Sequence, residues 1–279
     1  MKIRLLAGAA CLAVFGLAAA NPAMAQEEPG PITVSGTVGL VSDYRFRGVS
    51  MTDEEMAIQG GLTATHESGL YAGVWASNLS GWGTFGGANM ELDLVGGYAM
   101  EVSSGVTLDV GLTWYMYPGG YDKTDFAEPY IKLSGDIGPA SITTGIAYAP
   151  KQEALGPWYS QGGLDGYDNP GAKDDNVYLW ADAGFGVPDT GLSVTAHLGY
   201  SNGNPGLGPW GTSPAPTGEY LDWKIGADYA LGPVTLGVAY IDTNLSRSDT
   251  AYLQPNFSST KDGSQIAGST VVFSVSAGF

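Results

Sequence analysis

Charged side chains recur at every second position of otherwise apolar runs. These acids and bases are the residues whose types and spacing are suited to a functional site. Glu91 and Asp93, for example, alternate with apolar residues from Met90 onward. Side chains two apart lie on one face of an extended chain. We therefore expect one inward, pore-lining set: Asp43, Arg45, Arg47, Glu91, Asp93, Asp109, Glu128, Lys132, Asp136, Asp182, Asp222, Lys224 and Asp228.

This charged set is consistent with two arrangements. Acids and bases around a narrow lumen create a transverse field that orders water and selects ions. Alternatively, the charges form a salt-bridged plug, because buried charges must be paired. Nine acids stand against four bases in the set. An open pore is therefore expected to prefer cations weakly.

Two segments match motifs associated with catalysis or cofactor binding, but the residues around them do not fit the structure that each motif requires. Residues 206–211 match G-x-G-x-x-G, but they contain Pro and Trp and no helix follows. Residues 199–203 match a nucleophile elbow, but Pro205 follows where a helix must begin. His66 and His197 lack metal-ligand spacing, and each is expected in the lumen or at a turn. We expect no catalytic residue, no cofactor and no metal.

Composition narrows the class of protein. The formal charge of −17 would be repelled by phosphate backbones, which excludes nucleic-acid partners. The chain has 43 glycines among 279 residues and only 14% charged residues, which disfavours helical bundles. Hydrophobic residues make up 44% of the chain, enough to bury a large surface.

The first 25 residues have the features of a secretory signal peptide. Lys2 and Arg4 precede an apolar stretch, and residues 23–25 form an A-x-A cleavage site. We expect residues 26–279 to form one barrel domain. The chain's one cysteine, Cys11, lies in the leader, so the mature protein is expected to have no disulfide.

Period-two alternation predicts twelve strands in the mature chain. Loops after odd-numbered strands are long and turns after even-numbered strands are short, the pattern of an antiparallel up-and-down transmembrane barrel. A soluble sandwich mixes its connection lengths. The predicted strands span 32–44, 56–66, 70–79, 89–101, 106–117, 126–136, 140–149, 175–185, 191–201, 219–230, 234–241 and 265–279.

Aromatic residues on the apolar face gather at the two ends of these strands. Two aromatic belts around an aliphatic band are typical of a barrel in a bilayer. The chain also ends on Phe279 after apolar residues at alternate positions, like the last-strand signal that the barrel-assembly machinery reads. The outer belt would contain Trp114, Tyr148, Tyr200, Trp223 and Tyr240, and the inner belt Tyr98, Phe185, Tyr229 and Phe279.

Several segments resemble a known family. The segment 42–50, Ser-Asp-Tyr-Arg-Phe-Arg-Gly-Val-Ser, is the most specific, with further similarity at 58–61, 66–75, 91–98, 117–119, 197–201, 222–223 and 236–242. The chain is similar to the TorF-type porin family of proteobacteria, which was catalogued as conserved proteins of unknown function. Where that family has Pro before Ala-x-Gln-Gly, this chain has Met56. The resemblance implies an outer-membrane barrel with a porin role, and no established substrate.

We expect an outer-membrane channel for passive diffusion of small polar solutes or ions in a Gram-negative bacterium. The expected partners are outer-membrane lipid, lipopolysaccharide and the barrel-assembly machinery through Phe279. Side chains or loop 150–174 would form any constriction. A surface adhesin without an open pore is the alternative, since the long loops carry Trp158, Trp210, Tyr252 and Phe257, predicted to be exposed. A membrane-embedded enzyme is disfavoured, because the sequence has no clustered Ser/His/acid set to support it.

Overall fold

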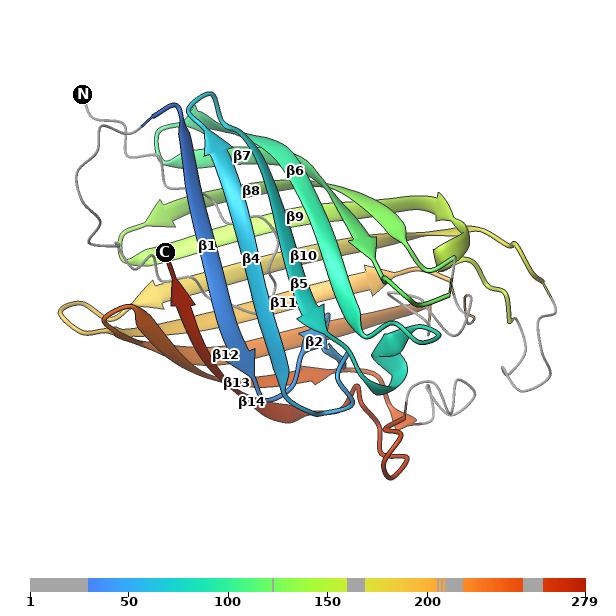
Figure 1. The fold of residues 1–279 in the computed structure, drawn as a ribbon. Coiled ribbons are helices and arrows are strands. Elements are labelled where there is room, and N and C mark those ends of the chain that lie inside the picture. Colours follow the sequence, from blue (N-terminus) through green and yellow to red (C-terminus); the bar gives the residue numbers. More distant parts are fainter. Residues whose placement is uncertain are drawn as a thin grey trace.

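The barrel is closed and antiparallel. The computed structural model describes residues 30–121, 123–159, 169–204, 206, 208, 218–247 and 258–279 of the chain. Each barrel strand pairs with its sequence neighbours, and β1 closes against β14, which confirms the predicted fold (Figure 1). The signal peptide predicted at 1–25 lies outside the described residues. The twelve barrel strands are β1 (Ile32–Val41), β4 (Ala57–His66), β5 (Leu70–Asn78), β6 (Met90–Ser103), β7 (Val106–Met116), β8 (Phe126–Ile137), β9 (Ala140–Gln152), β10 (Asp174–Gly186), β11 (Leu192–Asn202), β12 (Glu219–Leu231), β13 (Val234–Thr243) and β14 (Thr270–Gly278).

Long loops lie at one end of the barrel and short turns at the other, as the sequence predicts. The turn between β12 and β13, for instance, contains only residues 232–233, whereas 244–269 join β13 to β14. Three predicted strand ends differ by three residues or more. β1 stops at Val41 rather than at residue 44, β9 continues to Gln152 rather than to 149, and β14 begins at Thr270 rather than at 265. The segments 42–44 and 265–269 leave the sheet and contribute buried side chains, among them Tyr44 and Ile266.

The outer face of the barrel is apolar. Ile225 is 62% exposed and Leu198 is 54% exposed, although both are mid-strand. Such a continuous apolar surface is stable against lipid but not against water. Both predicted aromatic belts are present. At the loop end the exposed members are Trp114, Tyr148 and Tyr240, while Tyr200 and Trp223 are half-buried. At the turn end the exposed members are Tyr98, Phe185, Tyr229 and Phe279.

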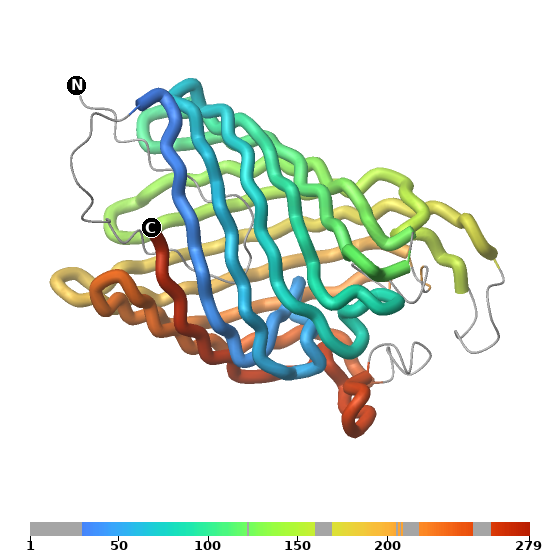
Figure 2. Tube along the Cα trace, viewed as in Figure 1, coloured from blue at the N-terminus to red at the C-terminus, as the bar shows by residue number. Residues whose placement is uncertain are grey.

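A small hairpin enters the mouth between β1 and β4. Its strands are β2 (Arg45–Phe46) and β3 (Val49–Ser50), joined at Arg47 and Gly48, which have φ values of 50° and 82°. Two consecutive positive φ angles make the two-residue turn that matches strand twist, and Gly accommodates the second. Figure 2 shows this blue segment turning back from the end of β1. The prediction that Asp43 lies in the first strand, 32–44, was therefore wrong: Asp43 precedes the hairpin, and Arg45 and Arg47 lie within it.

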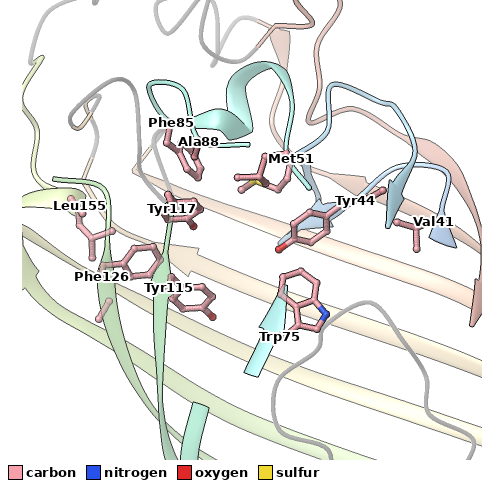
Figure 3. Packing of buried hydrophobic residues seen from close by; sticks show 14 of the residues in the cluster. Val41, Tyr44, Met51, Trp75, Phe85, Ala88, Tyr115, Tyr117, Phe126 and Leu155 are labelled. Atoms are coloured by element: carbon pink, nitrogen blue, oxygen red, sulfur yellow. The ribbon is translucent and has the colours of Figure 1, made fainter. Parts of the chain in front are cut away.

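The hairpin helps to fill the mouth with apolar side chains. Tyr44 and Met51 on its flanks belong to a buried cluster with Trp75 of β5 and Phe126 of β8 (Figure 3). The Tyr44 and Trp75 rings meet edge to face, with 5.4 Å between their centroids. The barrel mouth is thus narrowed mainly by residues 42–56, a source of constriction that the sequence did not indicate.

Two short 3-10 helices complete the mouth, η1 (Gly81–Thr84) and η2 (Glu153–Leu155). Leu155 of η2 joins the buried cluster, so part of loop 150–174 also enters the mouth. Trp158, predicted to be exposed, is 6% exposed: its ring meets that of Tyr121 edge to face, and its Nε1 donates to the Ala172 carbonyl at 3.2 Å. Trp210, Tyr252 and Phe257 lie outside the described residues. No described helix is long and apolar enough to cross a membrane.

Candidate pore lining

The structure places the predicted charged set on the inner side of the barrel, with one member at its end. Nine members are buried: Asp43, Arg45, Arg47, Glu91, Asp93, Asp109, Glu128, Lys132 and Asp222. Asp182, Lys224 and Asp228 are half-buried. Asp136 is exposed close to the turn between β8 and β9. Their role in lining a conducting path stays a prediction.

Arg47, at the tip of the hairpin, reaches the far wall of the barrel. Its Nη2 donates to both carboxylate oxygens of Glu128 on β8, at 2.8 and 2.7 Å. The guanidinium also lies over the ring of Tyr178 on β10, 4.0 Å from its centroid. The Tyr220 hydroxyl on β12 donates to the Arg47 carbonyl at 3.0 Å. Contacts with three strands fix the hairpin tip inside the lumen.

Arg45 anchors the base of the hairpin. Its Nε donates to Asp43 at 2.6 Å, and its Nη1 donates to the carbonyls of Gly48 and Gly268 at 3.0 and 2.9 Å. Asp43 accepts a further hydrogen bond from Ser50. The bond to Gly268 joins the hairpin to the segment before β14, and the others hold the hairpin to its own flank.

A second ion pair lies deeper on the wall formed by β5 to β8. Lys132 Nζ is 3.1 Å from Asp109, which also accepts a 2.7 Å hydrogen bond from the Tyr71 hydroxyl. Tyr71 and Tyr130 are hydrogen-bonded to each other. A Cβ at Gly97 or Gly111 would overlap these two hydroxyls, so the glycines let the tyrosines lie against the wall.

A histidine network occupies the opposite wall. His197 Nδ1 lies 2.7 Å from Asp182, and its Nε2 lies 3.1 Å from Asp222. Nε2 also lies 2.9 Å from the Tyr178 hydroxyl, so both ring nitrogens have hydrogen-bond partners on neighbouring strands. Neither nitrogen is free to act as a general base. The sequence places His197 in the lumen or at a turn, but it does not reveal these partners.

The inner half of the lumen is accessible to water. The Asp182 side chain is 44% exposed although it faces inward. Lys224 and Asp228 line a cavity of about 20 Å³ with Thr195 and Ser274, enough for about one water molecule. The apolar mouth has a second cavity of about 20 Å³ beside Phe46 and Met51. The lumen is thus polar on its inner side, whereas apolar side chains occupy the mouth.

Outside the mouth, charged loops surround the barrel rim. Lys123 Nζ lies 3.0 Å from Glu153 of η2, and this hydrogen bond holds the pKa of Glu153 below its usual range. Lys261 Nζ lies 2.9 Å from Glu55 and ties the loop before β14 to the segment after the hairpin. These exposed pairs are screened by salt and hold the loops weakly.

Inward aromatic residues were missed in the predicted set. Tyr44, Tyr71 and Tyr178 donate hydrogen bonds to Glu91, Asp109 and Asp222, respectively. The same period-two alternation would have identified Tyr71 and Tyr178, because both occupy polar-face positions of their strands. Tyr44 could not be identified in this way, since it lies in the hairpin.

Comparisons with known proteins agree with this architecture. A family model described as "Bacterial protein of unknown function (Gcw_chp)" matches residues 25–279. No curated protein matches the chain.

Two solved structures share the fold. One is described as the NanC porin, with a TM-score of 0.53 and 11% identity over 88% of this chain and 98% of that chain. The other is described as the KdgM porin, with a TM-score of 0.51 and 8% identity over 88% of this chain and 99% of that chain. At these identities the similarity shows the fold alone.

Proposed function

The chain belongs to the Gcw_chp family of bacterial proteins, and from that premise we propose that it is a porin-like channel of the TorF type. A closed barrel with an apolar outer face and two aromatic belts is the architecture of the bacterial outer membrane, where the protein is located. The proposed role is passive diffusion of small polar solutes or ions along the lumen.

The observation that carries this proposal is the polar inner lumen, which is open to water. Asp182 keeps 44% of its side chain exposed while facing the barrel interior. A barrel that serves only as an anchor gains nothing from this arrangement, because interior charges cost free energy of desolvation even when they are paired. The segment 42–56, which contains the hairpin, narrows the mouth, which limits the permeants to small ones.

The proposal includes a weak preference for cations. Acids exceed bases by five in the predicted lining. The resulting negative field lowers the entry energy of cations and raises that of anions.

A planar-bilayer recording tests the proposal. Val41 and Ala57 face each other across β1 and β4, so a short Gly-Ser turn can replace residues 43–55. We expect a small conductance from the complete protein and a several-fold larger one from this variant. Retained heat-modifiable mobility on SDS gels would show that the variant barrel is folded.

A structural or adhesive protein without an open pore is the second candidate. The packed mouth favours it, because Tyr44, Met51 and Phe126 belong to one buried apolar cluster. This candidate predicts no conductance from the complete protein and none from the folded hairpin-replacement variant. That pair of results would overturn the channel proposal.

A further inference from the structure

Lys224 and Asp228 on β12 are lumen charges that have no ion-pair partner in the described structure. Each lies within electrostatic range of the other, but the two groups do not form a salt bridge. The other bases of the predicted lining are paired: Arg45 with Asp43, Arg47 with Glu128, and Lys132 with Asp109. Charges held away from bulk water are costly unless they are paired, so this exception requires an explanation.

The strand register keeps the two groups apart. Both are half-buried on the inner face of β12, and Cα atoms four residues apart on a strand are separated by roughly 13 Å. None of the residues level with them on β11 and β13 is oppositely charged; these are His197 and Ile241 beside Lys224, and Ser193 and Gly237 beside Asp228.

The two remaining aspartates near Lys224 are engaged elsewhere. Asp182 lies 2.7 Å from His197 Nδ1, and Asp222 lies 3.1 Å from His197 Nε2. Asp222 also accepts a 3.1 Å hydrogen bond from the Tyr178 hydroxyl. The ammonium group of Lys224 is therefore available to a partner that comes from outside the protein.

One cavity is lined by both Lys224 and Asp228, on the wall formed by β11 to β14 (Figure 1). Thr195 and Ser274 contribute hydroxyl groups to it. Gly226 lies between the two charged residues on the same strand face and has no side chain to fill the space. The empty space, counted with the solvent to which the cavity opens, is about 380 Å³. Two opposite charges thus face one water-accessible space.

The position of this cavity places it on the path of a permeating solute. Val41, the last residue of β1 before the segment 42–56, also lines the cavity. A solute that passes the narrowed mouth therefore reaches the cavity next.

We propose that Lys224 and Asp228 form a binding subsite for small zwitterionic solutes of the amino-acid class. The carboxylate of the solute accepts hydrogen bonds from the Lys224 ammonium, and the ammonium of the solute donates to the Asp228 carboxylate. The hydroxyls of Thr195 and Ser274 can donate to the solute or accept from it. The inference rests on the proposed channel function and names a class of solute for it.

A zwitterion matches both the size and the charge of the subsite. The ammonium and carboxylate of an α-amino acid are about 3 Å apart, and each hydrogen bond to the protein adds about 2.9 Å. The resulting span exceeds salt-bridge distance and is shorter than the separation of the two Cα atoms. One inorganic ion would neutralise only one of the two groups, whereas a zwitterion pairs both through charge-assisted hydrogen bonds.

Tracer flux into liposomes containing the complete protein tests the subsite. L-alanine and lactamide are nearly identical in size, and both have zero net charge near neutral pH, but only alanine has separated charges. Sieving by size and the net field of the lumen therefore treat them alike. After subtraction of the flux into protein-free liposomes, alanine should cross several-fold faster than lactamide at low concentration, and its flux should saturate.

Two double variants of equal net charge locate the effect. Lys224→Met/Asp228→Asn removes both groups of the subsite, so the ratio of alanine flux to lactamide flux should fall close to one. Asp109→Asn/Lys132→Met removes an acid and a base that already pair with each other, so the ratio should stay high. Heat-modifiable mobility on SDS gels shows that each variant barrel is folded.

The outcomes separate this inference from the channel proposal. Equal alanine and lactamide flux through a barrel that conducts KCl would overturn the subsite and leave the channel in place. A high ratio retained in the folded Lys224→Met/Asp228→Asn variant would also overturn the subsite. No KCl conductance and no flux of either solute would overturn both. If the double variant does not fold, the shape-conserving variant Asp228→Asn replaces it, with the same fall in the ratio expected and an unchanged ratio contradicting the subsite.

Discussion

Arg47 shows how one side chain determines the state of the lumen. It is 5% exposed, and it pairs with Glu128, which is 3% exposed. A buried ion pair adds little net stability over an apolar pair, but removing one partner leaves a costly unpaired charge. The pair therefore acts mainly by holding the hairpin at one position.

Removing this ion pair stepwise should separate its two effects. Arg47→Met should destabilise the barrel by about 3–5 kcal/mol, because Glu128 then stays buried without a partner. Adding Glu128→Gln should recover most of that loss while the hairpin remains released. Urea unfolding in micelles measures the stability, and bilayer recording should show raised conductance in the double variant. Equal stability of the single and double variants would contradict this account.

The orientation of side chains across the wall can be tested at one depth. Thr195 on β11 pairs with Gly226 on β12, the residue after lipid-facing Ile225. Ile225→Arg should cost about 2–4 kcal/mol because the charge enters hydrocarbon. Thr195→Arg should cost less, because Thr195 lines the inner cavity with Asp228. Similar unfolding free energies for both variants would mean that the faces are assigned wrongly.

At the scale of elements, the last strand closes the barrel. Phe279 exchanges backbone hydrogen bonds of 2.9 and 3.0 Å with Gly36 of β1. Its ring is 63% exposed on the outer face, and a Cβ at Gly36 would overlap it. The contribution of the backbone hydrogen bonds that close the barrel can thus be separated by mutation from that of the aromatic ring.

Phe279→Ala keeps the backbone hydrogen bonds but removes the terminal aromatic group. We propose that the assembly machinery reads that group, and on this basis we expect barrel levels in cells to fall several-fold. Refolding into detergent in vitro should change little. Phe185→Ala, which removes another exposed aromatic residue of the inner belt, is the control. A matching fall in that control would attribute the effect to lost lipid contacts.

At the scale of the whole molecule, the balance of charge along the lumen should set ion selectivity. We expect weak to moderate cation preference in the reversal potential across a KCl gradient. The preference should be stronger at low salt, because screening acts over about 10 Å at 0.1 M. Glu91→Gln/Asp93→Asn should reduce it.

A charge-neutral change provides the matched control for selectivity. Asp109→Asn/Lys132→Met removes an acid and its paired base together, so the net charge of the lumen is unchanged. The reversal potential should therefore stay close to that of the complete protein. Anion preference in the unmodified channel would show that these carboxylates do not set the field.

The sequence by itself determined the barrel, because the decisive signals are local. Side chains alternate with period two along each strand, and lipid requires one apolar face. The number of strands and the face on which each side chain lies therefore follow from the spacing of apolar residues. Turn and loop lengths then give the antiparallel order. Burial of Glu91, Asp109 and Asp222 follows from the same alternation, and each is found buried.

The tertiary structure alone decided what fills the lumen. Arg47 meets Glu128 across 81 residues, and Arg45 meets Gly268 across 223 residues. Those contacts arise because β1 stops at Val41 and the chain turns inward. This path of the chain depends on packing against distant strands. Three further features depend on such long-range contacts. They are the buried position of Trp158, the two aspartates around His197, and the absence of an ion-pair partner for Glu91 in the described structure. A local pattern carries no information about them.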